Sequence, residues 1–162
     1  MFKVGIITAS DKGSRGERED LSAAAIRELV TAAGWEVTDY AVVPDEREII
    51  AAKMKEYADE KKLDLVLTTG GTGFSPRDVT PEATLDVVER LVPGIPELMR
   101  AESYKITPRA ILSRAAAGIR KGTLIINLPG SPKAVKENLN WILPALPHGL
   151  EILKGFTGEC AR

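Results

Sequence analysis

The stretch from Thr68 to Thr84, TTGGTGFSPRDVTPEAT, combines residue types that bind and transfer phosphate groups. Within it stand three glycines, a threonine, a cation and a carboxylate: Gly70, Gly71, Thr72, Gly73, Arg77 and Asp78. Glycine adopts positive φ at little cost and carries no Cβ, so such a loop can bring backbone N–H groups against an anion. The stretch therefore predicts an anion-binding loop. Close packing of a strand on a helix would also account for the glycines alone.

Two helix starts follow predicted strands. Thr80 is placed as an N-cap, with Pro81 at the first helical position and the acidic Glu82 in the first turn. The turn Pro129-Gly130-Ser131-Pro132-Lys133 predicts a second start, with Ser131 as its N-cap. A strand, a tight turn and a helix N-terminus in succession is an arrangement that α/β proteins use to hold phosphates.

The remaining elements alternate in type along the chain. Apolar or alternating runs predict strands at residues 4–9, 35–43, 63–67 and 123–128, and 3.6-residue periodicity predicts helices at 21–33, 46–61, 81–91, 95–104 and from 132 onward. Asp20 is placed to cap the first helix and Gly34 to end it, after a polar loop at 12–20. Residues 110–120 fit a helix or a hairpin, and the hairpin is preferred. The prolines at 144 and 147 are expected to interrupt the last helix, leaving a final helical piece at 148–154.

This order predicts an α/β three-layer sandwich around a mostly parallel sheet. In such sheets, ligands bind beyond the carboxyl ends of the strands. Ser10, Asp11, Asp45 and the glycine loop all follow strands directly. Together with Asp78 and Glu82 they form a set of polar groups that suits Mg²⁺ and phosphates, with Arg77 and Lys133 as cations. Each acid taken singly also fits a helix cap or a solvated side chain.

The length, charge and composition of the chain exclude several classes of function. A chain of 162 residues fits one domain spanning 1–162, and its net charge of −1 with a pI near 5.9 argues against nucleic acid as a partner. With no membrane-span-length apolar run and no signal peptide expected, we predict a cytoplasmic protein. The single Cys160 excludes an internal disulfide framework, and the single His148 disfavours a Ser-His-Asp triad. The glycine loop also lacks the Walker A frame.

The sequence resembles the molybdopterin adenylyltransferases of the MogA type and the related G domains of plant and animal fusion proteins. The resemblance spans nearly the whole chain. It rests on Ser10-Asp11, Pro44-Asp45-Glu46, Thr68 to Thr84, Ala110-Ile111-Leu112-Ser113-Arg114 and Asn127 to Lys133.

The resemblance implies a homotrimer that joins the AMP of Mg-ATP to the terminal phosphate of molybdopterin and releases pyrophosphate. A separate protein or domain then inserts molybdenum or tungsten. Asp45 and Asp78 match the essential acidic positions of the family, and we expect them to bind Mg²⁺. Ser113 matches a serine tied to pterin handling. The glycine loop and the Pro129 to Lys133 turn match ligand-binding loops.

Three other functions are compatible with this resemblance. The first is a MoaB-type paralogue without adenylylation activity, and the second is a trimeric carrier or scaffold that binds the pterin without modifying it. The third is a nucleotide-processing enzyme related to competence-damage proteins. The two acids favour the enzyme, because a scaffold has no need of Asp45 and Asp78 beside an anionic ligand. We also expect an oligomer interface at the C-terminal segment, whose apolar residues exceed those that one helix face usually buries: Trp141, Ile142, Leu143, Leu146, Leu150, Ile152 and Leu153.

Overall fold

The computed structural model describes residues 1–155, so Cys160 lies outside the described residues. Six strands form one sheet in the order β2-β1-β3-β6-β5-β4. The first four in this order pair in parallel, and β5 and β4 add antiparallel pairs at one edge. The strands are β1 (Lys3–Ala9), β2 (Glu36–Val43), β3 (Leu65–Thr69), β4 (Arg90–Leu91), β5 (Ala117–Arg120) and β6 (Thr123–Leu128). The predicted α/β fold with a mostly parallel sheet is confirmed.

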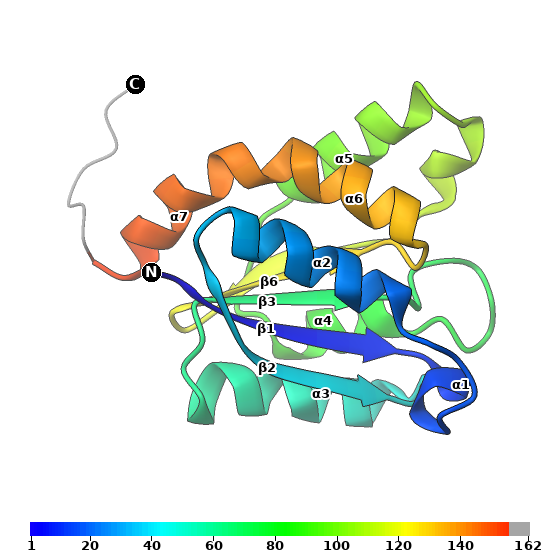
Figure 1. Cartoon of the computed structure of the whole chain (residues 1–162), viewed down its shortest axis with the longest axis horizontal. Coiled ribbons are helices and arrows are strands. Elements are labelled where there is room, and N and C mark those ends of the chain that lie inside the picture. Colours follow the sequence, from blue (N-terminus) through cyan, green and yellow to red (C-terminus); the bar gives the residue numbers. More distant parts are fainter. Residues whose placement is uncertain (156–162) are drawn as a thin grey trace.

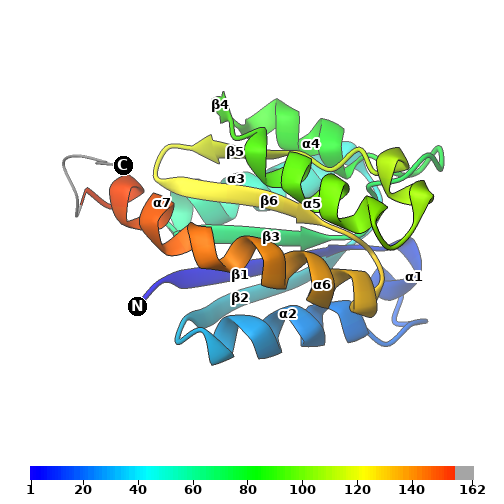
Figure 2. The same cartoon turned by 90° about the horizontal axis from the view of Figure 1, so that it is seen from above.

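Helices cover both faces of the sheet (Figure 1, Figure 2). The helices α2 (Leu21–Ala32), α5 (Gly94–Tyr104), α6 (Pro132–Ile142) and α7 (Leu146–Leu153) lie on one face, and α3 (Arg47–Lys55) and α4 (Thr80–Val87) lie on the other. Side chains of one strand alternate between the two faces, so Ile6 packs in one apolar cluster and Ile7 in the other. No helix among residues 1–155 combines the length and apolar character that crossing a bilayer requires.

Local helix signals place α2 and α6. The Asp20 carboxylate accepts a hydrogen bond from the Ala23 N–H at 3.0 Å, and Gly34 follows the helix with a φ of 86°. The Ser131 hydroxyl accepts from the Ala134 N–H at 3.2 Å. The predicted caps at Asp20 and Ser131 and the glycine at the end of α2 are therefore confirmed. The predicted hairpin is confirmed as well, because β5 pairs antiparallel with β6.

Several predicted boundaries were wrong. Thr80 is the first residue of α4, so it is not the N-cap. That helix ends at Val87, and the chain then forms the short strand β4, because Glu89 and Val92 donate backbone hydrogen bonds to β5. The predicted polar loop begins as the short helix α1 (Asp11–Ser14). The predicted helix at 46–61 is α3 followed by a π-helical turn, η1 (Glu56–Glu60), and the segment at 108–112 is a 3₁₀-helix, η2.

The C-terminal segment has one interruption. Residues Leu143–Ala145 form the 3₁₀-helix η3 around Pro144, as predicted. Pro147 does not interrupt the chain, because it lies in the first turn of α7, where a proline costs no helix hydrogen bond. Three of the apolar residues in this segment, Ile142, Leu146 and Leu150, are buried in the core.

Candidate active site at the carboxyl ends of the parallel strands

The loop after β3 can be built only from glycine at two positions. Gly70 and Gly71 have φ values of 92° and 73°. A Cβ on Gly70 would lie 2.5 Å from the Ala9 carbonyl oxygen, and one on Gly71 would lie 2.4 Å from the Thr80 hydroxyl oxygen. Thr80, at the start of α4, fixes the loop through two hydrogen bonds. Its hydroxyl donates to the Gly70 carbonyl at 2.9 Å, and its N–H donates to the Gly71 carbonyl at 3.1 Å. The glycines therefore bring the loop backbone against β1 and the start of α4.

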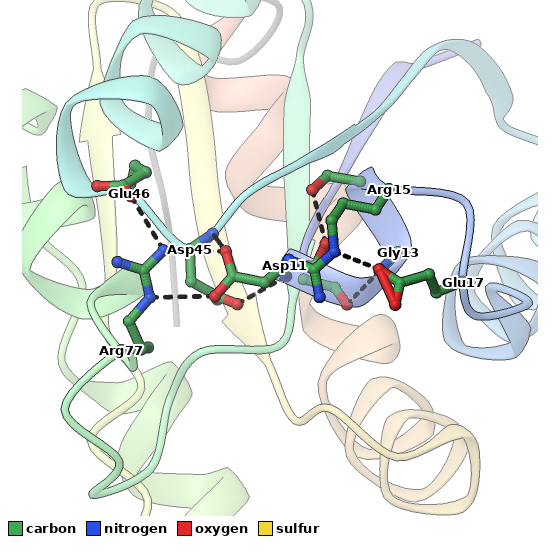
Figure 3. Close-up of polar contacts among 9 residues, drawn as sticks. Asp11, Gly13, Arg15, Glu17, Asp45, Glu46 and Arg77 are labelled. Carbon is green, nitrogen blue, oxygen red and sulfur yellow. Dashed lines mark hydrogen bonds and ion pairs between the residues drawn. The ribbon is translucent and has the colours of Figure 1, made fainter.

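A second group of contacts joins the ends of β1 and β2 (Figure 3). The Asp11 N–H donates to Asp45, and the Asp45 N–H donates to Asp11, each at 2.9 Å. Arg77 donates two hydrogen bonds of 3.0 Å to the Asp11 carboxylate and a third, of 2.9 Å, to Glu46. The hydrogen bonds and charge of Arg77 lower the pKa of Asp11. Arg77 is thus paired with two carboxylates rather than directed into the cleft.

Asp45 has the opposite electrostatic environment. Burial raises the pKa of Asp45, and the negative charges of Asp11 and Asp78 raise it further, against the lowering effect of the hydrogen bond from the Asp11 backbone. A carboxylate that is partly desolvated and close to two others gains from a nearby cation. Asp45 and Asp78 line the same cleft.

Asp78 closes a tight turn and does not cap α4. Its N–H donates to the Ser75 carbonyl at 2.8 Å, and its carboxylate accepts from the Ser75 N–H at 2.9 Å. A Cβ on Gly73 would lie 2.9 Å from the same carboxylate oxygen. The second carboxylate oxygen keeps its hydrogen-bonding capacity for another group.

Arg114 holds the whole loop in place, although no individual role was predicted for it. Its guanidinium donates to the Gly73 carbonyl at 2.8 Å, to the Asp78 carbonyl at 2.7 Å and to the Glu82 carboxylate at 2.6 Å. Its N–H donates to the Thr72 carbonyl at 2.9 Å. Glu82, predicted as a ligand-binding acid, is therefore an ion-pair partner within the scaffold, and its second carboxylate oxygen is buried.

The cleft between these loops has a volume of about 730 Å³. Seven predicted site residues line it: Ser10, Asp45, Gly70, Gly71, Asp78, Gly130 and Ser131. Three others, Asp11, Arg77 and Glu82, support those residues through the contacts described above. The cleft also extends over Thr8 and Tyr40, which the sequence did not single out, and over Asp20, which it predicted only as a helix cap.

Comparison with known proteins agrees with this geometry. Residues 5–148 match the family described as "Probable molybdopterin binding domain". The chain belongs to this family. It is 46% identical over 154 residues to the molybdopterin adenylyltransferase of Helicobacter pylori strain J99, covering 94% of this chain and 88% of that protein.

Solved structures show the same likeness. The molybdopterin biosynthesis enzyme MoaB of Thermus thermophilus is 53% identical, with a TM-score of 0.91 over 96% of this chain and 98% of that one. The molybdopterin biosynthesis Mog protein of Mycobacterium ulcerans is 33% identical, with a TM-score of 0.89 over 94% and 99% of the two chains.

The remaining predicted residues of this molybdopterin-binding domain lie around the cleft rather than in it. Ser113 and Pro129 line a separate small cavity of about 50 Å³ beneath α5. The Pro129 carbonyl accepts a hydrogen bond from the Thr69 hydroxyl at 2.6 Å. Lys133 is exposed in the first turn of α6, next to the cleft residue Ser131.

The described residues do not form a metal centre from side chains alone. Among residues 1–155, no group of three or more His, Cys, Asp or Glu side chains is arranged to hold an ion. Mg²⁺ is different, because it commonly takes one or two carboxylates and completes its shell with water and substrate phosphates. The pair Asp45 and Asp78 fits that donor set.

Proposed function

We propose that this chain is a molybdopterin adenylyltransferase, which joins AMP from ATP to the terminal phosphate of molybdopterin and releases pyrophosphate. The observation that carries the proposal is the placement of Asp45 and Asp78 in one cleft with the glycine loop and the start of α6. The relatives described above support the same activity, because the Helicobacter pylori protein carries that name.

The reaction joins an oxygen of the molybdopterin phosphate to the α-phosphorus of ATP, and the bond from that phosphorus to the pyrophosphate oxygen breaks. A phosphate monoester is already anionic at neutral pH, so the nucleophile needs no general base. This agrees with a cleft that no histidine lines among the described residues. The chain must instead position two anionic substrates and offset their charge.

Mg²⁺ belongs to the same proposal, and Asp45 and Asp78 are the residues that would hold it. When bound, it would neutralise charge that develops on the phosphate oxygens. The raised pKa of Asp45 supports this assignment, because a cation offsets the repulsion from Asp11 and Asp78. Backbone N–H groups of the glycine loop and of the α6 start would bind the remaining phosphate oxygens.

The decisive experiment is incubation with molybdopterin and Mg-ATP, followed by measurement of adenylylated pterin and pyrophosphate. We expect both products in equal amounts. Tight pterin binding without adenylylation would instead identify a carrier or a MoaB-type paralogue. ATP turnover that does not respond to molybdopterin would identify a nucleotide-processing enzyme of the competence-damage type.

We propose further that the protein is a cytoplasmic homotrimer, or a multiple of one, that hands its product to a metal-insertion protein. An apolar groove of about 480 Å³ between α5 and α7 supports assembly, because Leu98 and Ile152 remain 40% exposed beside it. The C-terminal segment contributes less than expected, since part of its apolar surface is in the core. A monomeric mass by light scattering at micromolar concentration would contradict the trimer.

A further inference from the structure

The cleft continues past Asp45 and Asp78 to a second end, to which the proposed reaction assigns no role. This end lies over β1 and β2, where Thr8, Asp20 and Tyr40 line the cleft. The helices α2 and α6 lie side by side on this face, and both begin at the edge of the sheet where β1 and β3 end (Figure 1). The two helix starts are tied together, because the Ser22 hydroxyl donates to the Gly130 carbonyl at 2.6 Å.

Thr8 brings an unsatisfied hydroxyl to the floor of this end. Its exposed fraction is 8%, and its hydroxyl oxygen has no hydrogen-bond partner among the described residues. Thr69, its register partner on β3, donates its own hydroxyl to the Pro129 carbonyl. Thr8 lies close to the Tyr40 hydroxyl and acts to lower its pKa, but the two groups do not form a hydrogen bond of regular geometry. A buried hydroxyl without a partner costs free energy, and a substrate group entering the cleft would satisfy it.

The Asp20 carboxylate provides hydrogen-bond acceptors at this end of the cleft. One carboxylate oxygen accepts from the Ala23 N–H, and the other accepts from the Tyr40 hydroxyl. Burial raises the pKa of Tyr40 to about 12, and Asp20 contributes to this shift, so the phenol stays protonated and remains the donor. Each carboxylate oxygen has a further lone pair for an incoming hydroxyl. The Asp20 carboxylate favours a group that donates hydrogen bonds. The cation Arg18 and the carboxylate Glu19 line the same cleft, so the charges here are of both signs.

We propose that Thr8 and Asp20, supported by Tyr40, form a subsite for the ribose hydroxyls of the nucleotide. This inference rests on the proposed adenylyl transfer. If the α-phosphate lies at Asp45 and Asp78, the nucleoside extends along the cleft to the other end. In dinucleotide-binding α/β folds, a carboxylate accepts a hydrogen bond from a ribose hydroxyl. The subsite makes the protein selective for ribonucleotides over deoxyribonucleotides.

Isothermal titration of the full chain with Mg-ATP, 2′-deoxyATP and 3′-deoxyATP tests the subsite without requiring turnover. We expect ATP to bind about tenfold more tightly than at least one deoxy analogue, the value for one lost hydrogen bond to a charged group. The variants Thr8→Val and Asp20→Asn should each reduce this ratio, because Val removes the Thr8 hydroxyl and Asn removes the charge of the Asp20 acceptor. Both substitutions preserve the shape of the side chain, and circular dichroism checks that each variant folds.

Thr38→Val is the matched control, because Thr38 lies on β2 two residues before Tyr40, is exposed, and donates to Asp39 at 2.8 Å outside the cleft. It should retain the full preference for ATP. Equal binding of ATP and both analogues by the unaltered protein would overturn the proposal, as would variants that keep the preference.

The same titrations with molybdopterin separate the two substrates. Weaker pterin binding in Thr8→Val, with nucleotide binding unchanged, would assign this end to the pterin and overturn the ribose subsite. A protein that prefers ATP through Thr8 and Asp20 but transfers no adenylyl group would contradict the proposed function and support the subsite. Adenylyl transfer without any ribose preference would support the proposed function and contradict the ribose subsite.

Discussion

Asp11 and Asp45 each accept a hydrogen bond from the backbone N–H of the other, at 2.9 Å in both directions. This reciprocal pair joins the ends of β1 and β2 and places two carboxylates side by side. Only Asp11 is neutralised, because Arg77 pairs with it through two hydrogen bonds. The other carboxylate, Asp45, lines the cleft, and burial and the nearby charges of Asp11 and Asp78 raise its pKa.

The two carboxylates should therefore titrate on opposite sides of the ordinary value of 3.8. NMR titration of the aspartate carboxyl carbons should give a midpoint below 3.8 for Asp11 and above it for Asp45. Stability from Asp11 is present above pH 3.8 and is lost as pH falls through its lowered pKa. The contribution of Asp45 has the opposite sign: it is present below 3.8 and is lost as pH rises through the raised pKa.

Variants identify the cause of each shift. Arg77→Gln should raise the pKa of Asp11, and Asp78→Asn should lower that of Asp45. Identical midpoints for the two carboxyls in the unaltered protein would contradict this electrostatic assignment.

Replacing Arg114 should loosen the glycine loop. Arg114→Ala removes three side-chain hydrogen bonds and leaves the Glu82 carboxylate unpaired, so we expect a loss of about 2 kcal/mol in the free energy of unfolding. Denaturant unfolding measures this loss. Arg109→Ala, at an exposed position on η2, should change stability by less than about 0.5 kcal/mol. Equal stability of the two variants would show that Arg114 does not hold the loop.

Asp78→Asn separates catalysis from binding. Asparagine can still accept from the Ser75 N–H, so the turn should persist, while the charge that would attract a cation is lost. We expect Mg-dependent transfer to fall about a hundredfold or more. Molybdopterin binding should stay intact or become slightly tighter, because one repulsive charge is gone.

The matched control is Asp86→Asn, which breaks an exposed ion pair with Arg47 outside the cleft and should leave turnover unchanged. Near-normal turnover in Asp78→Asn would remove Asp78 as a metal ligand. A parallel loss of pterin binding would indicate a structural role.

Lys133 tests whether the start of α6 binds phosphate. Lys133→Ala should weaken substrate binding about threefold at low ionic strength, with the difference shrinking as salt rises. Lys136→Ala, one turn later on α6 and exposed, should have little effect. Titrations at several salt concentrations measure both. Unchanged affinity of Lys133→Ala at low salt would place that side chain on the solvated surface.

Local signals were enough for much of the fold and part of the site. The caps at Asp20 and Ser131 and the glycine after α2 lie within a few residues of the helices they define. The apolar strands indicated the parallel sheet, and the sheet predicts that residues after its strands meet at one edge. Ser10, Asp45 and the glycine loop met there for that reason.

Contacts between distant segments were decided only by the tertiary structure. Arg114 reaches Gly73 across 41 positions, and Arg77 reaches Asp11 across 66, so no local pattern identifies either partner. The unsatisfied hydroxyl of Thr8 looks like any strand threonine in the sequence. Such roles depend on strand register and loop path, which the packed chain sets as a whole, whereas a cap or a glycine turn depends on a few adjacent residues.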